Sequence, residues 1–302
     1  MRIGTLMETD RPLDEIITQV QGFADAGFAS AWATQIFGHD SLTLLAVVGN
    51  RVSGIELGTA VIPVYARHPQ VMAQQALTVQ DASGGRLTLG IGLSHQMVVE
   101  NMWGYSYDRP ARYMREYLAA LMPMLEGEKV SVNGEVITAN TYAPLEIPGA
   151  AAPPVLVAAL APAMLGLAGR VAAGTVTWMT GTAAVAGHIV PTIREAAAAA
   201  GRPAPRVVVS LPVTVTEDTE HARERIDKAL ALYPSLPSYK AMLDKEGALR
   251  PSDIALVGNE EEVTDRLGAL AEAGATEFVA SIYGRPDEKE RSKAVLLAVN
   301  GD

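Results

Sequence analysis

Segments with strand periodicity and segments with helix periodicity alternate along this chain, and this alternation restricts its fold more than any other feature. Residues 2–7 predict a first strand, and residues 12–26 predict an amphipathic helix with apolar side chains at helical spacing. Further strands are expected at 29–34, 55–64, 86–92, 155–159, 174–178, 207–215 and 277–282, and further helices at 41–52, 68–82, 109–126, 163–171, 183–200, 218–232 and 260–273. Eight strands that alternate with helices predict an α/β fold, a (β/α)8 TIM barrel with insertions.

No linker or change of composition divides the 302 residues, so we expect a single domain over residues 1–302. Two stretches depart from the alternation. Residues 129–139 contain Asn133-Gly134 between two alternating runs, which predicts a β-hairpin. Residues 233–258 are longer than a barrel connection needs and mix proline, glycine and charge, which indicates an insertion near the mouth of the active site.

Charge and composition exclude several classes of partner. The formal net charge of −10 disfavours binding to nucleic acid or to an anionic membrane, so a small-molecule substrate is expected. The absence of cysteine excludes thiolate chemistry and fits a reducing, cytoplasmic location. The N-terminus lacks a secretory signal, and four prolines interrupt the uncharged stretch 147–169, so no membrane partner is expected.

The segment RLTLGIGLSH, residues 86–95, is the best candidate for the edge of an active site. It reads as a buried strand, and Ser94 and His95 follow its C-terminal end, where catalytic groups gather in barrels. Because an imidazole titrates near neutral pH, His95 is a plausible proton donor. His68, which precedes Pro69, favours a helix-capping role instead. The histidines and carboxylates show no metal-binding spacing, so no metal is expected.

Common nucleotide and hydrolase motifs are missing from the chain. The GIG of residues 90–92 lacks the third glycine of a dinucleotide fingerprint, and no nucleophile elbow or P-loop occurs. Small residues at 158–161 precede Pro162 and a helix, so backbone N–H groups there could bind a phosphate. A tightly packed strand-to-helix turn explains the same composition equally well.

The run LGTAVIPVYARHPQVMAQQALTVQDASGGRLTLGIG, residues 57–92, resembles the bacterial-luciferase-like flavin and deazaflavin oxidoreductases. Similar echoes occur at residues 159–174, 257–267 and 273–279, so the resemblance spans nearly the whole chain in order. It implies a TIM barrel with an insertion and a homodimer. The variants GIGLSH and RPARYMREYL look most like the branch that uses the deazaflavin coenzyme F420.

The resemblance also implies roles for particular residues. The bulge that backs the deazaflavin ring falls at Thr59, Ala60 and Val61, and a cis peptide bond is expected between the last two. The remaining cofactor contacts are expected at Gly92, Ser94, the phosphate-binding turn of Ala159, Leu160 and Ala161, and Thr180 and Gly181.

Departures from the family pattern bear on the reaction. Sugar-phosphate-oxidising relatives have an Asp-His pair after the second strand and a glutamate after the fourth, where this chain has Gln35-Ile36 and His95. A lysine expected just past Gly181 is also absent. These differences favour reduction of an activated C=C, C=N or C=O bond by the reduced deazaflavin, with His95 protonating the product. Gln35 is expected to hydrogen-bond the ring or substrate, or to be a scaffold amide.

Two other functions remain open on the sequence. An FMN-dependent luciferase-like monooxygenase uses the same barrel and would consume oxygen. A non-catalytic flavin-binding protein would retain its cofactor tightly, and His95→Ala would not affect any hydride transfer.

Overall fold

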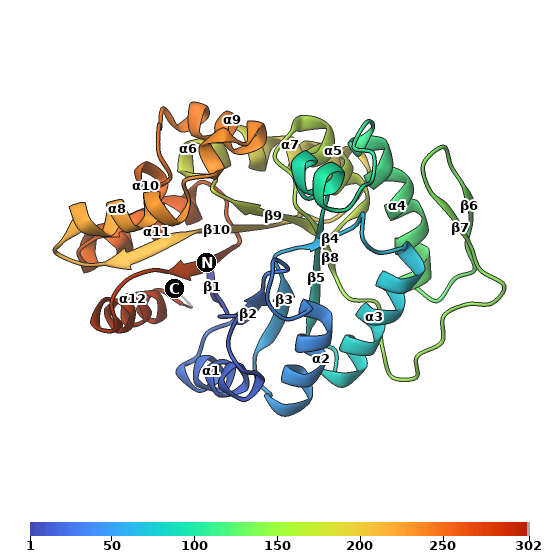
Figure 1. The fold of residues 1–302 in the computed structure, drawn as a ribbon, viewed down its shortest axis with the longest axis horizontal. Coiled ribbons are helices and arrows are strands. Elements are labelled where there is room, and N and C mark those ends of the chain that lie inside the picture. Colours follow the sequence, from blue (N-terminus) through green and yellow to red (C-terminus); the bar gives the residue numbers. More distant parts are fainter. Residues whose placement is uncertain (301–302) are drawn as a thin grey trace. The chain divides into compact units, whose positions relative to one another are not determined.

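The computed structural model describes residues 1–300, and its elements follow one another in the predicted order (Figure 1). Eight strands that pair in parallel are each followed by helical structure before the next of them begins. The predicted (β/α)8 class is therefore confirmed. The chain divides into two compact units, one built from residues 1–6, 25–32 and 159 onward, and the other from residues 7–24 and 33–158.

The first unit contains β1 (Arg2–Leu6), β2 (Ser30–Ala33, whose last residue lies in the other unit), β9 (Gly174–Trp178), β10 (Arg206–Val215), β11 (Leu256–Gly258) and β12 (Glu277–Ile282). Its helices are α5 (Pro162–Val171), α6 (Thr182–Ala184), the π-helix η2 (Val185–Ile189), α7 (Val190–Ala199), α8 (Thr219–Ala229), the 3-10 helix η3 (Tyr233–Ser235), α9 (Pro237–Glu246), α10 (Pro251–Ile254), α11 (Glu260–Glu272) and α12 (Pro286–Ala298). Glu277 is buried and accepts from Ser30 and from Arg206 Nη2, which ties β2 and β10 to β12.

The second unit contains β3 (Glu56–Thr59), β4 (Ile62–Pro63), β5 (Leu87–Gly92) and β8 (Val155–Val157), together with a separate hairpin of β6 (Ser131–Asn133) and β7 (Thr138–Asn140). Its helices are α1 (Leu13–Ala26, which ends in the other unit), α2 (Ser41–Arg51), α3 (Pro69–Ala82), the π-helix η1 (Val98–Met102) and α4 (Pro110–Leu125). All six residues of β5 are buried, and β5 pairs in parallel with β3, β4 and β8. This strand ends next to Ser94 and His95.

Several local expectations need correction. The strand expected at 55–64 is interrupted between β3 and β4, and the helix expected at 183–200 is divided by η2. The hairpin predicted at 129–139 is present as β6 and β7, but its turn spans residues 134–137 and is not centred on Asn133-Gly134. In this turn the Glu116 carboxylate accepts the backbone N–H groups of residues 135–137. Within residues 1–300, the helices all lack the combined length and apolar character that crossing a bilayer requires.

Candidate active site

The bulge between β3 and β4 lies where the family resemblance implied, and the peptide bond between Ala60 and Val61 is cis. The buried Thr59 hydroxyl donates to the Gly90 carbonyl at 2.7 Å and accepts from the Gly90 amide at 2.8 Å. The Ala60 amide donates to the Ala33 carbonyl at 2.8 Å. Thr59 therefore joins β3 to β5, and a cofactor contact from its hydroxyl stays a prediction.

Two glycines of β5 let this bulge approach closely. A Cβ atom on Gly90 would lie 1.9 Å from the Thr59 carbonyl oxygen, and one on Gly92 would lie 2.8 Å from Val61 Cγ2. Because no side chain separates the strands, the bulge packs directly on β5. Ala60 and Val61 remain half-buried, and their small apolar side chains form a surface without charge.

His95 follows β5 by three residues and is half-buried. Burial lowers the pKa of its imidazole below the usual value near 6.5. Its neighbour Ser94 has a left-handed backbone, with φ of 63°, and the Ser94 carbonyl accepts from the Tyr107 hydroxyl at 3.2 Å. The structure thus places an imidazole just past the C-terminal end of β5, in a chain segment held by Tyr107, a residue that sequence reasoning missed.

Gln35 and His68 take part in the scaffold of the second unit. The Gln35 side-chain oxygen accepts from the Ser41 amide at 2.8 Å, at the start of α2. This bond supports the scaffold role for that oxygen, and the role of Gln35 toward substrate stays a prediction. His68 caps α3 as predicted, because its Nδ1 accepts from the Gln70 amide and its Nε2 donates to the Thr138 carbonyl.

The turn expected to bind phosphate lies at the start of α5, in the first unit. Ala159 is buried, Leu160 is half-buried and Ala161 is exposed at the N-cap position. No side chain caps this helix end, so its first N–H groups have an electropositive, open setting that suits an anion. The Leu160 carbonyl accepts from His188 Nε2 at 2.7 Å, which fixes the turn and gives His188 a structural role.

Thr180 and Gly181, expected in the same pocket, are both buried after β9. The Thr180 hydroxyl donates to the Trp178 carbonyl at 3.2 Å. A Cβ atom on Gly181 would lie 2.6 Å from the carboxylate carbon of Glu246, and that carboxylate accepts from the Ala184 amide at 2.6 Å. The close Glu246 carboxylate is therefore sufficient reason for a glycine at position 181. The cofactor contacts of Thr180 and Gly181 stay predictions.

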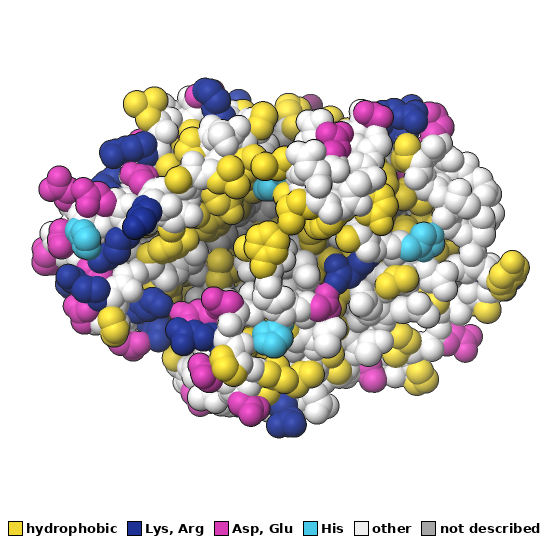
Figure 2. Space-filling model, in the orientation of Figure 1, with side chains coloured by type: hydrophobic (Ala, Val, Ile, Leu, Met, Phe, Trp, Pro, Cys, Tyr) yellow, Lys and Arg dark blue, Asp and Glu magenta, His cyan; other side chains and the backbone are white. Residues whose placement is uncertain are grey.

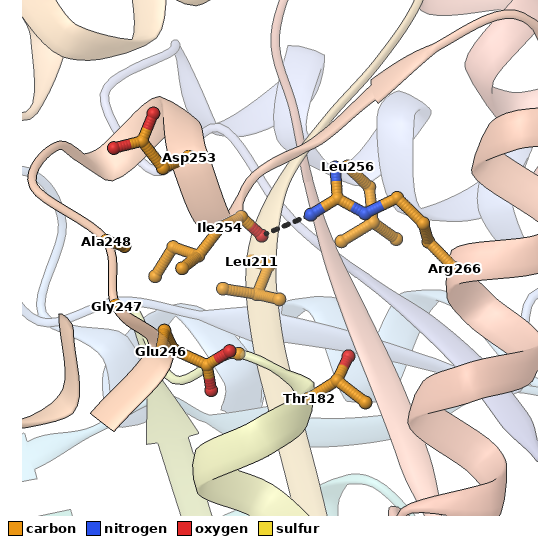
Figure 3. A pocket seen from close by; sticks show the side chains of 10 residues that line it. Thr182, Leu211, Glu246, Gly247, Ala248, Asp253, Ile254, Leu256 and Arg266 are labelled. Atoms are coloured by element: carbon orange, nitrogen blue, oxygen red, sulfur yellow. Dashed lines mark hydrogen bonds between the residues drawn. The ribbon is translucent and has the colours of Figure 1, made fainter. Parts of the chain in front are cut away.

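A cavity of about 290 Å³ lies beside Gly181 in the first unit (Figure 3). Its three charged side chains already have structural partners. Glu246 holds the start of α6, Asp253 accepts from the backbone before α10, and Arg266 donates to the carbonyls of Ala255 and Ile254. Burial lowers the pKa of Arg266 from its usual value. Because these groups are engaged, we do not place the reaction in this cavity.

In Figure 2, charged side chains of both signs gather mainly at the left of the face shown and toward its edges, and hydrophobic and uncharged groups cover most of its middle. Within residues 1–300, no three histidine or carboxylate side chains come together as a metal site would require.

Curated relatives match most of the chain. An uncharacterized protein of Mycobacterium tuberculosis is 29% identical over 276 residues, which are 84% of this chain and 81% of the relative. The 5,10-methylenetetrahydromethanopterin reductase of Methanolobus tindarius is 27% identical over 310 residues, which are 90% of each chain.

Solved structures share the fold. The coenzyme F420 dependent tetrahydromethanopterin reductase of Methanopyrus kandleri superposes with a TM-score of 0.82 at 21% identity, covering 99% of this chain and 97% of that one. The FMN complex of the oxygenating constituent of 3,6-diketocamphane monooxygenase, from a Pseudomonas putida plasmid, has a TM-score of 0.77 at 18% identity and covers 100% and 97%. At these identities the likeness concerns the barrel alone.

The family model described as luciferase-like monooxygenase matches residues 1–277. That match covers the βα units from β1 to the start of β12, with the cis-peptide bulge and the segment that carries His95 among them. The chain therefore belongs to the luciferase-like monooxygenase family.

Proposed function

We propose that this protein is a coenzyme F420-dependent oxidoreductase that transfers hydride between the deazaflavin and a small organic substrate. In the favoured direction it reduces an activated C=C, C=N or C=O bond. The observation that carries the proposal is that the bulge at Ala60–Val61 packs on β5 and the half-buried His95 follows the C-terminal end of the same strand. The F420-dependent reductase with the same fold and the related methanopterin reductase support this choice of chemistry.

Each unit contains residues that fit one part of the cofactor. In the second unit, the cis-peptide bulge backed by Gly90 and Gly92 offers an apolar surface for a flat ring. In the first unit, the uncapped start of α5 at Ala161 offers backbone N–H groups for a phosphate. Within the second unit, we propose the bulge and Ser94 as contacts for the ring. Within the first unit, we propose the start of α5, Thr180 and Gly181 as contacts for a phosphate.

When bound, the deazaflavin supplies a hydride, because carbon in place of flavin N5 disfavours one-electron and oxygen chemistry. The protein has to orient the acceptor and provide a proton. His95 has the chemistry for the second task, since burial makes its imidazolium a stronger acid than an exposed one. The proposal includes a small-molecule acceptor, a homodimer and a cytoplasmic location, without a nucleic-acid or membrane partner.

The experiment is an anaerobic turnover assay. Purified protein is mixed with reduced F420 and with a set of enones, imines and ketones, and the absorbance of oxidised F420 is followed together with the product. We expect oxidation of F420 that depends on the acceptor. Failure of every acceptor class, with oxidised F420 and secondary alcohols equally inert, would refute hydride transfer.

The second candidate function is an FMN-dependent monooxygenase, which the FMN-bound structure with the same fold favours. The test is oxygen uptake by the protein supplied with reduced FMN. Uptake coupled to an oxygenated product, in the absence of F420 activity, would replace our first proposal with this one.

A further inference from the structure

Residues 94–107 form a loop whose two ends are joined by a hydrogen bond. The Tyr107 hydroxyl donates to the Ser94 carbonyl at 3.2 Å, across thirteen positions of the chain. Inside the loop, the His95 carbonyl accepts from the amides of residues 98 and 99, where η1 begins. The backbone of His95 is therefore fixed by hydrogen bonds on both sides, at the point where the two ends of the loop meet.

The Tyr107 ring is held in place by other tyrosines. Its centroid lies 5.6 Å from that of Tyr65, and Tyr65 stacks on Tyr113 of α4 with centroids 4.0 Å apart and planes at 19°. The Tyr107 amide also donates to Glu100 Oε1 at 3.3 Å. Because ring and backbone are both fixed, the direction of the Tyr107 hydroxyl is fixed as well.

The bond from Tyr107 acts on the peptide group that leads into His95. The Ser94 carbonyl and the His95 amide belong to the same planar unit, so fixing the carbonyl fixes the plane from which the His95 side chain starts. Ser94 has a left-handed φ of 63°, a conformation that a serine seldom keeps without support from its surroundings.

We propose that Tyr107 is the positioning residue for His95, so that the tyrosine hydroxyl sets the direction from which the imidazole delivers its proton. This inference rests on the proposed hydride transfer with His95 as the proton donor. Burial raises the pKa of Tyr107, so the phenol stays a donor throughout the working pH range. The ionisable groups packed around Tyr65 and Tyr107 are Glu100 of the loop, Asp108 directly after it, and Tyr113 of α4.

The test compares two tyrosines of the same loop. Tyr107→Phe keeps the ring and removes the donor, and Tyr105→Phe is the matched control, because Tyr105 is 50% exposed. With reduced F420 and cyclohexenone, we expect Tyr107→Phe to lower kcat about tenfold with little change in KM, because a misdirected group loses rate more than binding. Tyr105→Phe should leave both unchanged.

A double mutant separates positioning from a general structural role. In a His95→Gln background, Tyr107→Phe should cause no further loss, because the group that it directs is already gone. If Tyr107→Phe costs the same factor in both backgrounds, or costs nothing in the wild type, the inference is wrong.

A second measurement keeps the inference separable from the proposed function. In proton NMR, the C2 proton of His95 is identified among the five histidines by its loss in His95→Gln. If neither the wild type nor any variant reduces cyclohexenone, the pH titration of this resonance tests the link between Tyr107 and His95. A change in Tyr107→Phe but not in Tyr105→Phe supports the link between the two residues, and identical curves in wild type and Tyr107→Phe overturn it.

Discussion

Thr59 and Gly90 exchange two hydrogen bonds, since the threonine hydroxyl donates to the glycine carbonyl and accepts from the glycine amide. This exchange joins β3 to β5 at Thr59, the last residue of β3, one residue before the cis peptide bond between Ala60 and Val61. Thr59→Val keeps the shape and leaves the buried Gly90 N–H without this partner, which should lower the free energy of unfolding by about 1–3 kcal/mol. Chemical denaturation measures it, and Thr59→Ser, which keeps the hydroxyl, is the control. Equal stability of Thr59→Val and wild type would contradict the assignment.

Gly90 should not tolerate even one added carbon. Its Cβ would lie 1.9 Å from a backbone oxygen that cannot rotate away. We expect Gly90→Ala to lower the free energy of unfolding by about 3 kcal/mol, or to prevent folding. In Gly22→Ala, on the exposed face of α1 with nothing within 4 Å, the same change should stabilise the helix by up to about 1 kcal/mol. Similar denaturation midpoints for the two variants would show that position 90 does not lie as close to the Thr59 carbonyl oxygen as the structure indicates.

His95 carries the proposed proton transfer. His95→Gln should lower the rate of F420-linked reduction by about 10²–10⁴ and leave F420 affinity nearly unchanged, because general acid catalysis contributes to the rate and not to cofactor binding. Stopped-flow single turnovers with reduced F420 measure this. The control is His221→Gln, since His221 is exposed on α8. An unchanged rate in His95→Gln would remove His95 from the mechanism.

The pH dependence follows from the lowered pKa of His95. Reduction needs the protonated imidazole, and its fraction falls as the pH rises through a value below 6.5. The rate of reduction should therefore be highest in mild acid and fall about tenfold per pH unit above that pKa. Oxidation needs the neutral ring and should rise through the same pKa to a plateau near neutral pH. A pH profile that His95→Gln leaves unaltered would refute both statements.

Part of this structure follows from local sequence patterns. The strands at 174–178 and 277–282 and the cap at His68 are where the residues predict them. A short run rich in β-branched and aromatic residues and a proline-initiated helix are both patterns of neighbours in sequence. Helix α12 was missed. Its buried face includes Glu288 and Ser292, and Glu288 is paired with Arg225, so the apolar periodicity that marks other helices is weak there.

The contacts that shape the candidate site could not be found from patterns. The bond between Tyr107 and Ser94 spans thirteen positions, and the carboxylate of Glu246 reaches α6 from a helix more than sixty residues later. Neither contact can be recognised from a periodic pattern in the sequence. Each forms only because the fold brings together two segments that are distant along the chain. Only the resemblance to a family pointed to the bulge at Ala60–Val61.

Direct comparison of the two cofactors tests the central claim. Purified protein is titrated into F420 and, separately, into FMN, and quenching of cofactor fluorescence is followed to saturation. The account predicts saturable quenching of F420 and weaker binding of FMN. Preferential binding of FMN, with F420 fluorescence unchanged, would contradict it.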